Sequence, residues 1–123
     1  MDAKALRRRL EAAREFDTAF LAATLRVRAP DRLRVREIIQ AAKSDAEAMS
    51  RIAVESVVGW SGVSVGLLDP EAPEAERGDP LLFAPELVRP LLALDPDETD
   101  RMLNRVLERV EELRARAEAA RKN

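Results

Sequence analysis

The sequence contains no cysteine, no histidine and no tyrosine, and only four of its 123 residues are aromatic. Without cysteine there is no disulfide, no thiolate nucleophile and no zinc–thiolate site. Without histidine, the usual general base near neutral pH and the commonest transition-metal ligand are missing. The sequence also has no phosphate-binding glycine motif and no nucleophile elbow. We therefore expect a protein that is not an enzyme, with no catalytic residue, no cofactor and no metal.

What the chain does contain is typical of a small helical domain. Hydrophobic residues make up 46% and charged residues 36% of the sequence, with 21 alanines and 16 leucines. These are strong helix formers, and they must build the core in place of aromatic side chains. The first residues are charged, and no run of apolar residues is long enough to cross a membrane. We expect a single domain over residues 1–123, located in the cytoplasm and without membrane contact.

Charge is distributed unevenly although the net charge is only −2. Residues 1–36 hold ten basic and five acidic side chains, whereas residues 66–100 hold two arginines and ten acidic side chains. The arginines could suggest a nucleic-acid surface, but the chain is acidic overall and this region lacks stacking aromatics, so nucleic acid is not the expected partner. A basic end that meets the acidic loop of a neighbouring copy is the alternative, and we expect a homo-oligomer. The arginines concerned are Arg7, Arg8, Arg9, Arg26, Arg28, Arg32, Arg34 and Arg36.

Hydrophobic periodicity predicts a mainly α fold, with about four helices around one long helix. Thr24–Arg28 alternates apolar and polar residues, which favours a strand, but Ala22-Ala23 favours a helix. A short strand or hairpin near residues 16–28 therefore remains an option. A Gly/Pro-rich acidic loop is expected over residues 59–82. The expected helices cover residues 2–14, 31–58, 84–93 and 96–122, with Asp2 as the first N-cap and an acidic cap at Asp95-Pro96.

The last predicted helix carries an apolar seam about two heptads long. This seam either packs inside the domain or forms a contact with another chain. In the second alternative, the partner-binding residues are Val106, Val110 and Leu113.

The single tryptophan, Trp60, lies between Gly59 and Gly62 where the predicted long helix ends. Gly59 suits a left-handed helix C-cap and Gly62 suits a tight turn. We expect Trp60 to seal one end of the core and Phe83 to hold the loop where it returns. This structural motif comprises Gly59, Trp60, Gly62, Val63, Phe83, Glu86 and Leu87.

These motifs resemble the tail assembly chaperones of long-tailed bacteriophages, which also occur in prophages and gene transfer agents. The resemblance covers residues 16–105 and depends on Arg28 and Pro30, Asp45, the Gly59–Val63 segment, and Phe83 with Glu86-Leu87. It implies a non-enzymatic protein that binds the tape measure protein and recruits tail tube subunits during tail assembly. The alternatives are a head–tail connector or tail-completion protein of a phage-like particle, or a helical adaptor unrelated to phages.

Overall fold

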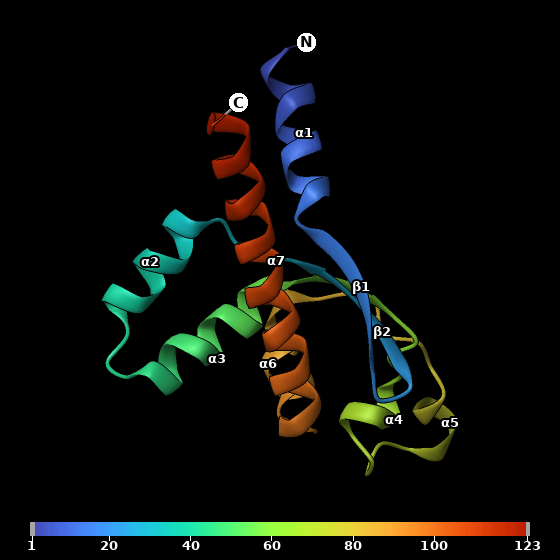
Figure 1. Cartoon of the computed structure of the whole chain (residues 1–123). Helices are drawn as coiled ribbons and strands as arrows, with labels where there is room; N and C mark the ends of the chain where they lie inside the picture. Colours follow the sequence, from blue (N-terminus) through green and yellow to red (C-terminus); the bar gives the residue numbers. More distant parts are fainter. Residues whose placement is uncertain (1, 123) are drawn as a thin grey trace.

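The structure, a computed structural model, describes residues 2–122 (Figure 1). Within that range, seven α-helices, one short 3₁₀ helix and one three-stranded antiparallel sheet surround a single hydrophobic core. The sheet has the order β1-β2-β3, with β1 at Glu15–Phe20, β2 at Ala23–Arg28 and β3 at Val57–Ser61. The helices are α1 (Ala3–Ala13), α2 (Arg32–Ala41), α3 (Asp45–Ser56), α4 (Val65–Leu68), α5 (Glu74–Arg77), η1 (Pro85–Leu87), α6 (Val88–Leu92) and α7 (Pro96–Lys122).

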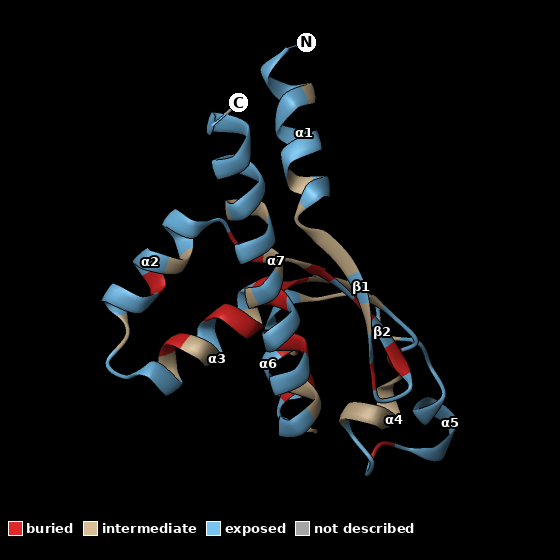
Figure 2. Ribbon diagram, viewed as in Figure 1, coloured by how far each residue is buried: buried red, intermediate tan, exposed pale blue. Residues whose placement is uncertain are grey.

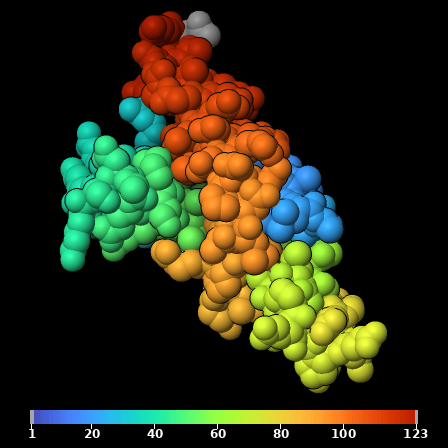
Figure 3. All heavy atoms as spheres, turned by 90° about the horizontal axis from the view of Figure 1, so that it is seen from below, coloured from blue at the N-terminus to red at the C-terminus, as the bar shows by residue number. Residues whose placement is uncertain are grey.

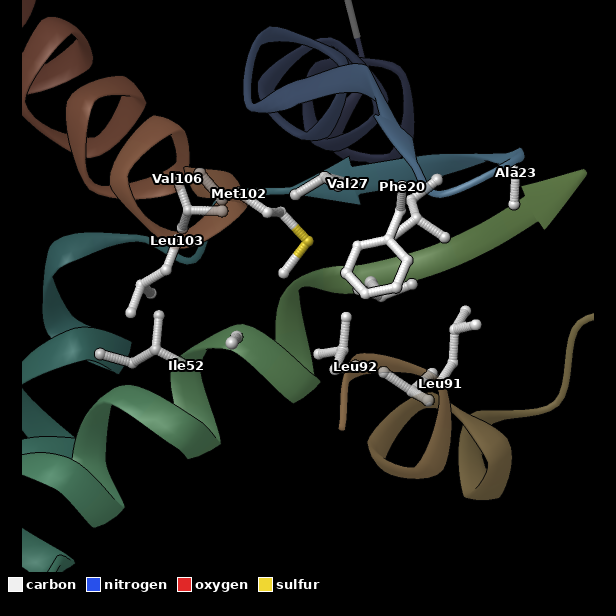
Figure 4. Close-up of a cluster of buried hydrophobic side chains, with 14 of the residues drawn as sticks. Phe20, Ala23, Val27, Ile52, Leu91, Leu92, Met102, Leu103 and Val106 are labelled. Atoms are coloured by element: carbon white, nitrogen blue, oxygen red, sulfur yellow. The ribbon is translucent and has the colours of Figure 1, made fainter. Parts of the chain in front are cut away.

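The expectation of a mainly α fold around one long helix is wrong, because a sheet forms the centre of a mixed α/β fold. Its central strand β2 buries Ala23, Leu25 and Val27 and exposes the residues between them. The buried face meets α3, α6 and α7 (Figure 4), where Phe20 and Met102 are among the largest fully buried side chains. The alternation of apolar and polar residues over Thr24–Arg28 therefore indicated the strand correctly, whereas Ala22-Ala23 wrongly favoured a helix.

The β1–β2 hairpin turns through only two residues, Leu21 and Ala22. Leu21 has φ 53°, a left-handed conformation that hairpin turns usually assign to glycine, asparagine or aspartate. This turn closes a register in which Phe20 pairs with Ala23 and Glu15 with Arg28. Because neither turn residue is a usual turn former, no local pattern indicated where the hairpin reverses.

The predicted helix over residues 31–58 is two helices, α2 and α3, separated at Ala42–Ser44. Ser44 caps α3 by accepting a hydrogen bond from the Glu47 backbone N–H at 3.1 Å. Glu47 in turn accepts one from the Lys43 backbone N–H at 2.7 Å. The Ser-x-x-Glu spacing is the sequence signature of a helix start. After Ser56 the β-branched pair Val57-Val58 begins β3 rather than extending the helix.

The segment predicted as a loop, residues 59–82, is more ordered than expected. It begins inside β3 and contains the short helices α4 and α5. A bridge between Ser64 and Pro80 joins the chain just before α4 to the chain that follows α5. The short helix predicted for residues 84–93 is η1 followed by α6, with Pro85 at the start of η1. Pro90 lies in the first turn of α6, where proline removes no helical hydrogen bond.

The last helix, α7, has the range that its cap predicts, and Asp95 accepts a hydrogen bond from the Glu98 N–H at 3.1 Å. Its first half packs on the core, while its second half extends beyond the sheet to the end of the molecule where α1 also lies (Figure 1). The α4–α5 region lies at the opposite end from the α7 C-terminus (Figures 1 and 3). Among the described residues, no helix is both long and apolar enough to span a bilayer.

Candidate partner-binding site

The aromatic residues singled out in the sequence form a structural cluster. The rings of Trp60 and Phe83 meet edge to face, with centroids 4.9 Å apart. The Trp60 indole N–H donates a hydrogen bond to the Leu81 carbonyl oxygen at 2.9 Å. Both rings are half-buried against the core, so this cluster fixes the returning loop to the sheet. Its geometry is that of packing.

The two glycines beside Trp60 have different roles. Gly62 has φ 78°, and a Cβ there would lie 3.3 Å from the Ala22 carbonyl oxygen. Gly59 is not a left-handed helix C-cap as predicted: it lies inside β3, opposite Arg26. Val63 is buried, Leu87 is half-buried, and Glu86 is exposed in η1. These residues support the fold at the end of the sheet.

The three predicted partner-binding residues of α7 divide between two environments. Val106 is fully buried and Val110 is 9% exposed, so both belong to the core. For Val106 the structure shows the first alternative, packing inside the domain, because the sheet and α3 cover that part of α7 (Figure 4). Leu113 lies one turn beyond Val110 and is half-buried at the edge of a groove.

This groove, of about 670 Å³, runs between α1 and the second half of α7. Leu10 and Ala13 of α1 line one side, and Val110, Leu113 and Ala117 of α7 line the other. We call it the α1–α7 groove. No residue of α1 is buried (Figure 2). Leu10 is 58% exposed. Two helices thus present apolar side chains to a space that no other part of the described chain fills.

Arginine side chains of α7 hold the base of the groove together. The Arg109 guanidinium donates hydrogen bonds to the carbonyl oxygens of Ala13, at 3.1 Å, and Glu15, at 3.3 Å. The guanidinium carbons of Arg105 and Arg109 lie 4.6 Å and 5.4 Å from the centre of the Phe16 ring. These cation–π contacts and hydrogen bonds fix the junction between α1 and β1 against α7. The groove is therefore anchored at one end and open along its length.

The rim of the groove is predominantly basic. Of the side chains that line it, two are carboxylates, Glu11 and Asp31, and five are arginines: Arg7, Arg14, Arg32, Arg114 and Arg121. Arg7 pairs with Glu11 at 3.1 Å. Arg114 pairs with Glu111 and Glu118, and its hydrogen bond to Glu111 lowers the pKa of that carboxyl group. Positive charge remains in excess, so the rim favours a negatively charged partner.

Three of the eight arginines that suggested a nucleic-acid surface are engaged in ion pairs with Glu15 or Glu55. Arg26 and Arg28 both hydrogen-bond Glu15 across the hairpin, each at 2.7 Å. Arg34 forms a bidentate pair with Glu55. The hydrogen bond from Arg28 is the largest cause of a lowered pKa for Glu15.

Within residues 2–122, no group of three or more carboxylates comes together as a metal site.

Sequence reasoning missed one half of the groove. The stripe of Leu6 and Leu10 on the first helix was visible in the sequence, but nothing local shows that this stripe lacks a partner in the fold. A signal was nevertheless present. The first helix has 11 residues, and isolated helices shorter than about 12–15 residues are marginal in water. A short amphipathic helix therefore depends on a partner that covers its apolar face.

Comparisons with known proteins give no relative for this chain: no family model matches it, and neither a curated protein nor a solved structure does.

Proposed function

We propose that this protein is a non-enzymatic tail assembly chaperone that binds amphipathic helices of a tape measure protein in the α1–α7 groove and recruits tail tube subunits. The observation that carries the helix-binding role is the unfilled groove between two amphipathic helices. The choice of tape measure protein depends on the Gly59–Val63 and Phe83–Leu87 motifs of the resemblance.

A third helix is the occupant that best suits this groove. Its floor is made of Leu10, Ala13, Leu113 and Ala117, which supply the small and branched apolar side chains that helix-in-groove binding uses. A bound helix would cover α1, which has no buried residue in the free protein. The basic rim favours a helix with acidic residues beside its apolar stripe, because opposite charges steer association. Tape measure proteins have long apolar helices that need such cover before the tail is built.

Co-expression with the tape measure protein encoded in the same gene cluster tests the proposal. We expect the wild-type chaperone to keep that protein soluble and to co-purify with it. The double variant Leu10→Glu/Ala117→Glu places two carboxylates on the groove floor, at positions that are exposed in the free protein. It should reduce the recovered complex about tenfold or more, because each carboxylate loses water on binding.

A matched control has the same residue changes away from the groove, at exposed Leu33 and Ala119. Leu33→Glu/Ala119→Glu should rescue the tape measure protein as the wild type does. The proposal fails if the wild type gives neither solubility nor a complex, or if both variants bind equally well.

The second candidate function, a structural part of a phage-like particle, makes a different prediction. A connector or tail-completion protein stays in the purified particle, whereas a chaperone leaves before the particle is complete. Mass spectrometry of purified particles separates the two: abundant peptides from this chain would favour the structural role.

A further inference from the structure

The segment between α4 and the end of α5 presents a strongly acidic surface. Residues 69–79 contain five carboxylates and one arginine, and all of these side chains are exposed. We call this segment the acidic lobe. Its carboxylates are Asp69, Glu71, Glu74, Glu76 and Asp79. Within the described chain, no salt bridge joins any of them to a basic side chain.

An apolar side chain follows the acidic lobe directly. Leu82 is 87% exposed, the most exposed of the large apolar residues. The backbone immediately before it is held in place, since the Leu81 N–H donates to the Val63 carbonyl oxygen and the Trp60 indole N–H donates to the Leu81 carbonyl oxygen. The acidic lobe therefore presents unpaired negative charge, and the exposed Leu82 follows it in the chain.

The α1–α7 groove has the complementary properties, with an excess of arginine on its rim and an apolar floor. The lobe cannot reach the groove of its own chain, because the two lie at opposite ends of the molecule (Figures 1 and 3). A second copy can supply it. We infer that the acidic lobe of one copy, with Leu82, binds in the α1–α7 groove of another.

This contact is heterologous: each copy offers one lobe and one groove, so copies join head to tail. Attraction between an exposed acidic and an exposed basic surface is screened by salt, since the Debye length falls from about 10 Å at 0.1 M to about 3 Å at 1 M. Self-association is therefore strongest at low ionic strength. If the proposed function holds, a tape measure helix competes with the lobe for the groove and releases single copies from the assembly.

Sedimentation velocity of the purified protein over a range of concentrations, at low and high salt, tests self-association. We expect the average mass to rise with concentration at low salt and to fall toward that of a monomer at high salt. A monomer at all concentrations at low salt overturns the inference. This outcome leaves the proposed function standing, because co-expression with a tape measure protein measures a different contact.

Charge reversal locates the contact. The groove variant Arg32→Glu/Arg121→Glu and the lobe variant Glu71→Arg/Glu74→Arg change exposed side chains only. Each variant alone pairs like charges and should stay monomeric. An equimolar mixture restores opposite charges at both kinds of contact and should regain the wild-type mass. Retention of wild-type mass by either variant alone overturns the inference.

A control pair excludes general attraction between proteins of different net charge. Arg8→Glu/Arg89→Glu and Glu37→Arg/Glu108→Arg change the net charge by the same amounts at exposed positions outside the groove and the lobe. Each control alone should self-associate as the wild type does. If the controls also become monomeric, net charge rather than the proposed contact governs association, and the inference is wrong.

Discussion

Trp60 and Phe83 pack edge to face with their ring planes at 77°, and this contact joins β3 to the segment that returns from the acidic lobe. The pair lies 23 residues apart in sequence and is completed by the Trp60 hydrogen bond to Leu81. Because Trp60 is the single tryptophan, its fluorescence reports on this junction alone.

Replacing Phe83 should loosen the junction. Phe83→Ala removes half of an aromatic pair and part of the loop's buried surface, and we expect it to lower the free energy of unfolding by about 2 kcal/mol. Phe83→Leu keeps the apolar contact and should cost less. Urea unfolding followed by tryptophan fluorescence and by far-UV circular dichroism measures both. Equal stability of Phe83→Ala and wild type would contradict the structural role.

The break between α2 and α3 depends on the cap at Ser44. Ser44→Ala leaves the Glu47 N–H without its side-chain acceptor, and we expect a loss of about 1 kcal/mol. Ser50→Ala is the control, because Ser50 is exposed inside α3, where alanine is the better helix former. The loss of stability in the two variants is compared by thermal unfolding. If Ser50→Ala is the more destabilising change, the position of the helix start is wrong.

Arg109 should control how firmly α1 is held beside α7. Arg109→Ala removes two hydrogen bonds to the α1–β1 junction and one cation–π contact with Phe16, worth about 1–2 kcal/mol together. Amide hydrogen exchange should become faster in residues 3–16 and stay unchanged in α3. Arg116→Ala, at an exposed position on the same helix, should leave exchange unaltered. Unchanged exchange in Arg109→Ala would show that α1 is held by other contacts.

Acid should weaken the hairpin through Glu15. Its pKa is below the ordinary value of 4.5 because Arg28 and Arg26 hydrogen-bond the carboxylate. A carboxyl group whose pKa is lowered on folding stabilises the fold above its unfolded-state pKa, and this stabilisation disappears as pH falls through the folded-state value. Glu15→Gln should therefore lose stability near neutral pH and show a smaller further loss below about pH 4.5. The urea midpoint as a function of pH measures this.

Glu108→Gln is the matched control for the acid experiment, since Glu108 is exposed on α7. Its pH profile should follow that of the wild type. If Glu15→Gln and Glu108→Gln have the same profile, the ion pairs of Glu15 do not contribute to acid sensitivity.

Local signals in the sequence identified some elements and missed others. The Asp95-Pro96 cap located α7, and the alternation of Thr24–Arg28 identified β2, because both depend on neighbouring residues only. The Ser44-x-x-Glu47 start was hidden inside a long run of helical periodicity. The β1–β2 turn could not be predicted because Leu21 adopts a left-handed conformation, which leucine disfavours. The pairing of β2 with β3 joins residues far apart in sequence, which periodicity cannot show.

The candidate site was predicted only in part for a similar reason. Val106 and Leu113 follow the same spacing along one face of α7, so periodicity assigns them the same role. Their difference comes from what lies opposite: the core covers the first half of the helix and ends near Val110. The point at which α7 extends beyond the elements that pack on it is set by the whole fold, so the periodicity of the helix alone cannot show it.

Hydrogen exchange on the complex with the tape measure protein tests the central claim most directly. If the α1–α7 groove receives a tape measure helix, exchange should slow on binding in α1 and in residues 110–121, with little change in the Trp60–Phe83 region. Protection confined to other surfaces, or no change in α1 although a complex has formed, would contradict the account.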